Sequence, residues 1–103
     1  MRIIKEKTLI GYCQLSKYKQ ATESLKSFIY EVRYSHWENA NELKLKYRNA
    51  SILSSKRVVF NIKGNDYWLI VDIEYKLGIV FIVWFGTHIE YEKTDARIVS
   101  YEN

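Results

Sequence analysis

Residues 57–67 read Arg57-Val58-Val59-Phe60-Asn61-Ile62-Lys63-Gly64-Asn65-Asp66-Tyr67, and this stretch decides the fold. The segment from Val58 to Ile62 is rich in β-branched and aromatic side chains, which favour a strand. Gly64-Asn65-Asp66 then supplies turn-forming residues, and the chain returns from Tyr67 to Tyr75. In the returning strand one face carries Leu69, Val71, Ile73 and Tyr75, and the other carries Trp68, Ile70, Asp72 and Glu74. The stretch therefore predicts an antiparallel hairpin that packs one face against helices.

The rest of the chain predicts a third strand after the hairpin and helices before it. Lys76-Leu77-Gly78 turns the chain into a strand from Ile79 to Phe85, so a three-stranded meander is the simplest topology. Met1 to Ile4 is compatible with a short edge strand. A short helix is predicted for Glu6 to Leu15. A longer second helix is predicted from apolar residues at helical spacing, which are Ala21, Leu25, Phe28, Ile29 and Val32, with Trp37 closing the stripe. A third, short helix through Leu43, Leu45 and Tyr47 could be capped by Asn39 or Asn41. This order of elements predicts an α+β fold.

Length and charge limit the number of domains and the kinds of partner that the protein can have. A chain of 103 residues with 48% hydrophobic residues can build one core but not two, so residues 1–103 are expected to form a single domain. The net charge of +4 is unevenly spread, because residues 1–57 hold twelve Lys and Arg against five Asp and Glu. The basic face is therefore expected from the N-terminal half, and it favours polyanionic partners.

Cysteine usage and hydropathy indicate a cytoplasmic protein. Cys13 is the only cysteine and there are two histidines, so the chain offers neither an internal disulfide nor zinc-ligand spacing. No metal or cofactor is expected. The N-terminus lacks the apolar stretch of a signal peptide, and the longest apolar run, Gly78 to Gly86, falls far short of the roughly 20 residues of a membrane helix.

Two residues near the end of the third strand could carry acid–base chemistry. Cleaving RNA without a metal needs a base for the 2′-hydroxyl proton, a cation for the phosphate and an acid for the departing 5′-oxygen. His88 follows Gly86-Thr87 at a strand end, and histidine titrates near neutral pH. Tyr91 projects from the same side if the segment is one helical turn. The structural alternatives are a turn-capping histidine and a tyrosine used for packing.

Basic and aromatic residues supply candidates for RNA contacts. Arg57, Lys63 and Lys93 are expected to flank the same strand ends, where they could hold phosphates. A basic stretch interleaved with Tyr47 consists of Lys44, Lys46, Arg48, Lys56 and Arg57. This pattern is compatible with tracking of an RNA backbone, and also with a solvated helix face. Trp68 shares its face with charged residues, so it could be a stacking platform, a partner contact or a cover for the sheet.

Both decisive segments resemble a known family. Arg57 to Asn65, together with Gly86-Thr87-His88, Glu90-Tyr91 and Lys93, is similar to the two signatures of HigB-type toxins from type II toxin–antitoxin systems, in the RelE-like mRNA interferase superfamily. The similarity continues upstream through Tyr34-Ser35-His36-Trp37, Asn41, Leu43 and Asn49-Ala50-Ser51-Ile52-Leu53, and so covers nearly the whole chain.

The resemblance implies a structure and a function. It implies a RelE-like fold, with an antiparallel sheet of three to four strands packed with two to three N-terminal helices. It implies a metal-independent endoribonuclease that cuts messenger RNA on the ribosome. It also implies a HigA-type helix-turn-helix antitoxin, through which the toxin meets operator DNA only indirectly.

The resemblance also assigns residues. By position, His88 and Tyr91 are the catalytic candidates, and a general-base role for His88 is a hypothesis. The candidates for RNA contacts are Arg57, Lys63, Lys93, Lys46 and Arg48.

Two positions depart from the family's pattern. Members commonly have arginine where this chain has Trp68, and many have a basic residue where it has Val83. An indole lacks the five N–H donors and fixed charge of a guanidinium. The alternative function is therefore a catalytically weak or inactive RelE-like module that binds the antitoxin or RNA.

Overall fold

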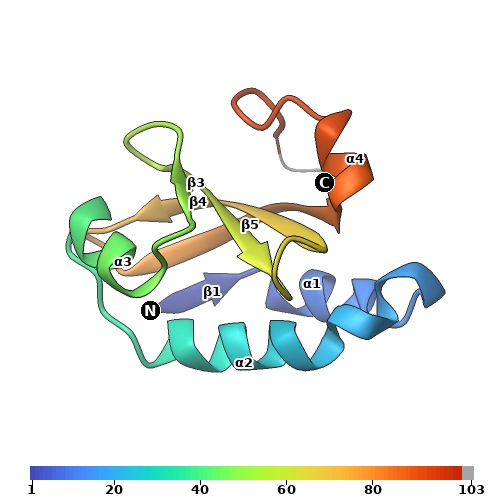
Figure 1. The fold of residues 1–103 in the computed structure, drawn as a ribbon. Helices are drawn as coiled ribbons and strands as arrows, with labels where there is room; N and C mark the ends of the chain where they lie inside the picture. The colour runs from blue at the N-terminus through green and yellow to red at the C-terminus, as the bar shows by residue number, and fades with distance from the viewer. Residues whose placement is uncertain (101–103) are drawn as a thin grey trace.

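The computed structural model describes residues 1–100 and places four α-helices and a short 3₁₀ helix around a five-stranded sheet (Figure 1). The elements are β1 (Arg2–Ile4), α1 (Glu6–Tyr12), η1 (Ser16–Ala21), α2 (Thr22–Arg33), α3 (Ala40–Lys46), β2 (Ser51–Ile52), β3 (Arg57–Ile62), β4 (Tyr67–Glu74), β5 (Ile79–Thr87) and α4 (His88–Glu92). The predicted α+β class is confirmed. In the described part of the chain, no helix combines the length and apolar character needed to cross a membrane.

The sheet has the strand order β1-β5-β4-β3-β2. The predicted meander of β3, β4 and β5 is confirmed, since both of its pairings are antiparallel. The predicted count of three to four antiparallel strands is wrong, because β2 pairs with β3 and β1 pairs in parallel with β5. The two-residue β2 is exposed, so its sequence carries no apolar alternation that could reveal a strand.

The β3–β4 turn begins one residue before the predicted Gly64-Asn65-Asp66. Lys63 and Gly64 both adopt left-handed backbone conformations, with φ of 54° and 64°. The second of these positions suits glycine, which has no Cβ to clash in this region. The Asp66 backbone N–H donates to the Lys63 carbonyl oxygen at 3.2 Å and closes the turn.

Helices α1, α2 and α3 and the 3₁₀ helix η1 pack against one face of the sheet, as Figure 1 shows for α2, and their apolar faces form the main core. The stripe predicted on α2 is buried, and Trp37, which follows the helix, is 5% exposed. α1 ends at Tyr12 rather than Leu15. Of the two predicted caps for α3, Asn39 is the one used, since its side chain accepts the Glu42 N–H at 3.0 Å.

The opposite face of the sheet carries a second apolar cluster beneath the C-terminal segment, residues 93–100. This second cluster consists of Val59, Ile70 and Ala96, with partly buried Leu53, Trp68, Val83, Trp84, Tyr91 and Val99 packed against it. The predicted division of β4 into two faces is thus confirmed. Trp84 of β5 is half-buried here.

A β-bulge in β5 gives the second cluster an extra side chain. Ile70 pairs with Trp84 and Val71 pairs with Ile82, so Val83 is the additional residue of β5. Val83 and Trp84 therefore both contribute to the second cluster although they are adjacent in sequence.

Candidate functional site

Helix α4 begins directly where β5 ends, and a capping box fixes its first turn. The Glu90 N–H donates to the Thr87 hydroxyl oxygen at 3.2 Å, and the Thr87 N–H donates to the Glu90 carboxylate at 2.9 Å. The helix has five residues, which confirms that His88 and Tyr91 lie on one helical turn. Both of their rings meet Trp68 of β4.

The His88 imidazole lies between Trp68 and Glu92. The Trp68 indole N–H donates to His88 Nδ1 at 3.0 Å, while His88 Nε2 lies 2.8 Å from a Glu92 carboxylate oxygen. An indole nitrogen can only donate, so Nδ1 must offer its lone pair. The tautomer that fits both contacts carries its proton on Nε2, which faces Glu92.

Trp68 also stacks on Tyr91. The two ring centroids are 4.6 Å apart with an angle of 9° between the planes. Both residues are half-buried against the second cluster. Of the roles open to Trp68 from its sequence, the structure shows that it covers this face of the sheet and carries a stacked ring.

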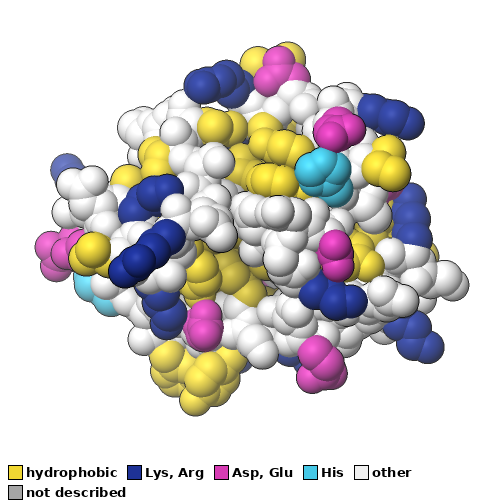
Figure 2. Space-filling model, viewed as in Figure 1, with side chains coloured by type: hydrophobic (Ala, Val, Ile, Leu, Met, Phe, Trp, Pro, Cys, Tyr) yellow, Lys and Arg dark blue, Asp and Glu magenta, His cyan; other side chains and the backbone are white. Residues whose placement is uncertain are grey.

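The C-terminal segment and these rings line an open surface hollow of about 700 Å³, here called the α4 hollow. Its lining includes Trp68, His88, Tyr91, Glu92, Lys93 and Arg97. Figure 2 shows hydrophobic side chains gathered near α4 beside a histidine, with acidic and basic side chains around them. The hollow thus combines aromatic surface, a titratable pair and two cations. Among residues 1–100, His, Cys, Asp and Glu side chains form no group of three that could hold a metal ion.

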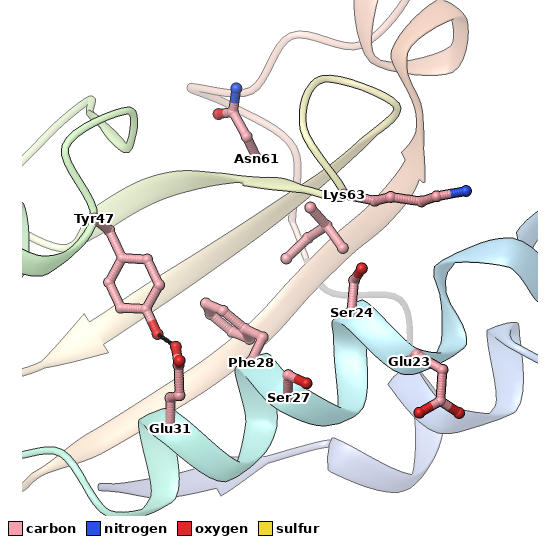
Figure 3. Close-up of a pocket in the computed structure, with 9 residues that line it drawn as sticks. Glu23, Ser24, Ser27, Phe28, Glu31, Tyr47, Asn61 and Lys63 are labelled. Atoms are coloured by element: carbon pink, nitrogen blue, oxygen red, sulfur yellow. Dashed lines mark hydrogen bonds between the residues drawn. The ribbon is translucent and has the colours of Figure 1, made fainter.

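The predicted RNA-contacting lysines and Arg48 do not all meet at this hollow. Lys93 lines it. Lys63 instead lines a hollow of about 360 Å³ between α2 and β3, together with Glu23 and Glu31 (Figure 3). Lys46 and Arg48 are exposed near the end of α3.

Tyr47, which lies between Lys46 and Arg48 in the sequence, contacts α2 and β3. Its hydroxyl donates to the Glu31 carboxylate at 2.6 Å, the contact drawn in Figure 3. Burial and this carboxylate raise the pKa of the Tyr47 phenol. Its ring packs edge-on against Phe28 and Phe60. Tyr47 is therefore part of the core rather than a stacking surface between the two cations.

Arg57 lies at the opposite end of β3 from Lys63, so the expectation that the two flank the same strand end is wrong. The Arg57 guanidinium donates to both Asp72 carboxylate oxygens at 2.6 and 3.0 Å. Its Nη1 also donates to the carbonyl oxygens of Ala96 and Val99 at 2.9 and 2.7 Å. The side chain is 13% exposed. Arg57 thus ties the C-terminal segment to the sheet.

Three residues to which the sequence analysis assigned no role also belong to the site or support it. Glu92 contacts His88, and its position four residues later on a helix could have signalled the pair. Arg97 reaches across the hollow, where its Nη1 donates to the Leu53 carbonyl oxygen at 2.9 Å. Glu90 accepts the Lys17 ammonium and the Tyr18 hydroxyl, both at 2.8 Å, and so fastens α4 to η1.

The Glu90 carboxyl titrates at unusually low pH. Burial alone would raise its pKa, but the hydrogen bonds from Lys17, the Thr87 N–H and the Tyr18 hydroxyl outweigh burial and lower the pKa to about 2. Each of these donors favours the charged form. Glu90 is therefore a structural anchor for α4 in its ionised form.

Comparison with known proteins places this site in a family. A model of the HigB toxin, described as the RelE-like toxic component of a toxin–antitoxin system, matches residues 21–94. The matched region spans α2 to the end of α4 and includes Trp68, His88 and Tyr91. No curated protein matches the chain at a significant level. Because the match covers well over half of the 103 residues, the chain belongs to the HigB toxin family.

Proposed function

We propose that this toxin is a ribosome-dependent messenger-RNA endoribonuclease that works by metal-independent acid–base catalysis. The observation that carries the proposal is the α4 hollow, where the His88–Glu92 pair and the Tyr91 phenol lie beside cationic Lys93 and Arg97. These groups match the needs of RNA cleavage, which are proton transfer at two oxygens and neutralisation of phosphate charge.

The reaction would be an internal attack within the RNA. The 2′-oxygen bonds to phosphorus as it loses its proton, the bond from phosphorus to the 5′-oxygen breaks, and the products are a cyclic phosphate and a 5′-hydroxyl end. Lys93 and Arg97 are cations that line the same hollow as the titratable groups, and the aromatic surface offers a place for a nucleobase to stack.

More distant cations would guide the RNA backbone. Lys46, Arg48 and Lys63 are exposed, so they can contact phosphates outside the α4 hollow. The N–H groups of Arg57 are directed to Asp72 and to two carbonyl oxygens, so we assign Arg57 an indirect contribution through the C-terminal segment.

A toxin component implies an antitoxin partner. We propose a HigA-type partner with a helix-turn-helix domain, which would connect this chain to operator DNA without direct contact. Both partners would act in the cytoplasm, where translating ribosomes are found.

The test is controlled expression of the toxin with and without the neighbouring antitoxin gene, followed by mapping of messenger-RNA 5′ ends on translating ribosomes. We expect growth arrest and new ends, both relieved by the antitoxin. His88→Ala and Tyr91→Phe should lose the new ends while the proteins stay folded. His36→Ala is the matched control, since it removes the other histidine, which lies outside the α4 hollow.

A second function has its own supporting observation. Both nitrogens of His88 are hydrogen-bonded within the protein, and Trp68 and Val83 occupy positions where the resemblance led us to expect cations. A catalytically weak or inactive module that binds antitoxin or RNA would retain this arrangement. It would show normal growth and no new 5′ ends, yet would form a stable complex with the antitoxin.

A further inference from the structure

We propose that Glu92 is the general base of this site, and that His88 acts as a neutral hydrogen-bond donor held in place by Trp68. This inference rests on the endoribonuclease function proposed above and deepens it. It reverses the general-base role that the sequence suggested for His88. It rests on the hydrogen bonds of the imidazole and on how firmly each of its partners is held.

The bond from Trp68 removes the nitrogen that a histidine base would need. A neutral imidazole accepts a proton only at its lone pair, which in this tautomer lies on Nδ1. The indole N–H occupies that lone pair at 3.0 Å, and an indole cannot reverse the bond by accepting one. Protonating His88 would therefore require breaking the contact with Trp68.

Trp68 is held more firmly than Glu92. The indole is stacked on Tyr91 at 4.6 Å and packs against the second cluster, so moving it would uncover apolar surface. The Glu92 side chain is 64% exposed and can reorient at little cost. The side of the ring open to RNA is thus Nε2, where the imidazole presents an N–H rather than a lone pair.

Glu92 is the carboxylate best placed to take the proton. Glu90 is fixed by Lys17, Tyr18 and the Thr87 N–H, so its oxygens are directed away from this role. Asp95 also lines the hollow, but its Oδ1 accepts the Arg97 backbone N–H at 3.1 Å. Glu92 remains beside the imidazole, whose N–H orients the carboxylate.

The proton transfers balance within the hollow. The 2′-hydroxyl proton passes to a Glu92 oxygen as the bond from the 2′-oxygen to phosphorus forms. The bond from phosphorus to the 5′-oxygen breaks, and the 5′-oxygen takes the proton of the Tyr91 phenol. Proton exchange with solvent then restores both side chains. His88 keeps its Nε2 proton throughout and is a positioning residue for Glu92.

The kinetic test uses single-turnover cleavage by the full chain on ribosomes programmed with one messenger. Glu92→Gln should lower the rate by about 10²–10⁴-fold, as for loss of a general base. His88→Ala should also be severely slowed. His88→Gln should keep at least about a tenth of the wild-type rate, because an amide can accept from Trp68 and donate to Glu92 but cannot carry a transferred proton.

Asp95→Asn is the matched control for Glu92→Gln, since it neutralises the other exposed carboxylate of the hollow. If His88→Gln is as inactive as His88→Ala, or Glu92→Gln cleaves at the wild-type rate, the inference is wrong while the endoribonuclease function stands. If the wild-type chain does not cleave, the proposed function fails and the assignment of Glu92 fails with it.

A second measurement needs no RNA. The chain has two histidines, so nitrogen NMR of the imidazoles resolves His88 from exposed His36. We expect His88 Nε2 to carry the proton, and a scalar coupling across the hydrogen bond between Trp68 Nε1 and His88 Nδ1. Trp68→Phe should abolish the coupling, whereas Trp84→Phe should retain it. A proton on Nδ1 of neutral His88 in the wild-type protein would overturn the positioning role of Trp68.

Discussion

Replacing Arg57 with methionine tests whether this residue is a structural tie rather than a direct RNA contact. Methionine keeps much of the side-chain length but removes the charge and every N–H donor. The change deletes two hydrogen bonds to Asp72 and one each to the carbonyl oxygens of Ala96 and Val99. It also leaves Asp72, whose side chain is 20% exposed, without the guanidinium.

The expected loss of stability is large for a single substitution. Hydrogen bonds to charged groups contribute about 1.5–3 kcal/mol each, although neighbouring bonds are not additive. Removing one partner of a buried ion pair typically costs about 3–5 kcal/mol. Because the Arg57 side chain is 13% exposed, we expect the lower end, about 3 kcal/mol.

Urea unfolding measures this loss directly. At a slope of about 1.5 kcal/mol per molar urea, the midpoint should fall by roughly 2 M. Hydrogen exchange should accelerate at the Ile98 and Val99 amides, which donate to the Asp95 carbonyl oxygen within the C-terminal segment. Arg48→Met is the control, because Arg48 is exposed and its loss should change stability by under about 0.5 kcal/mol. A loss below about 1 kcal/mol for Arg57→Met would refute the structural role.

Three further predictions concern the anchoring of α4. The Glu90 pKa falls from 4.5 to about 2 on folding, so its charged form stabilises the protein above pH 4.5 and this contribution is lost as the pH falls toward 2. In Glu90→Gln, the free energy of unfolding measured by acid titration should therefore decrease less steeply between pH 4.5 and pH 2 than in the wild-type protein. Thr87→Ala removes a helix cap and should lower the free energy of unfolding by about 1 kcal/mol in urea titrations, whereas Thr87→Ser should not. Gly86→Ala would place a Cβ 2.6 Å from a Trp84 ring carbon, so it should cost about 1–3 kcal/mol and shift Trp84 fluorescence.

The sequence predicted the elements whose patterns are long and regular. The hairpin from Val58 to Tyr75 follows alternation over many residues, and α2 follows an apolar stripe that is buried as expected. β1 matches the short edge strand expected for Met1 to Ile4, although its parallel pairing with β5 was not predicted, and the two residues of β2 are too few for a period to emerge. They become strands because β5 and β3 present free edges for pairing, which is a tertiary effect.

In the candidate site, contacts between residues close in sequence could be predicted, whereas contacts that depend on tertiary structure could not. His88 and Tyr91 are close in sequence, and helical spacing was enough to place them together. The indole of Trp68 meets them through the register that pairs it with Gly86, a contact that depends on sheet geometry. The tie from Arg57 to the C-terminal segment was not predictable, because Ala96 and Val99 lie about forty residues away and their backbone carbonyls leave no mark in the sequence.

The two positions where the resemblance led us to expect basic residues, Trp68 and Val83, lie in the same part of the structure. Trp68 and Val83 both pack against the second cluster, where a guanidinium would have to be buried against Ile70 or displace the C-terminal segment. Their apolar side chains instead help to seat that segment on the sheet.

The C-terminal segment in turn brings Lys93 and Arg97 to the α4 hollow. Arg57 holds this segment on the sheet by donating hydrogen bonds to two of its carbonyl oxygens. Under the proposed function, Lys93 and Arg97 of the C-terminal segment would therefore supply the phosphate-binding charge. Placing an arginine at position 68 would remove the indole bond to His88 and the stack on Tyr91. For this reason, Trp68→Arg should impair the site of this chain rather than improve it.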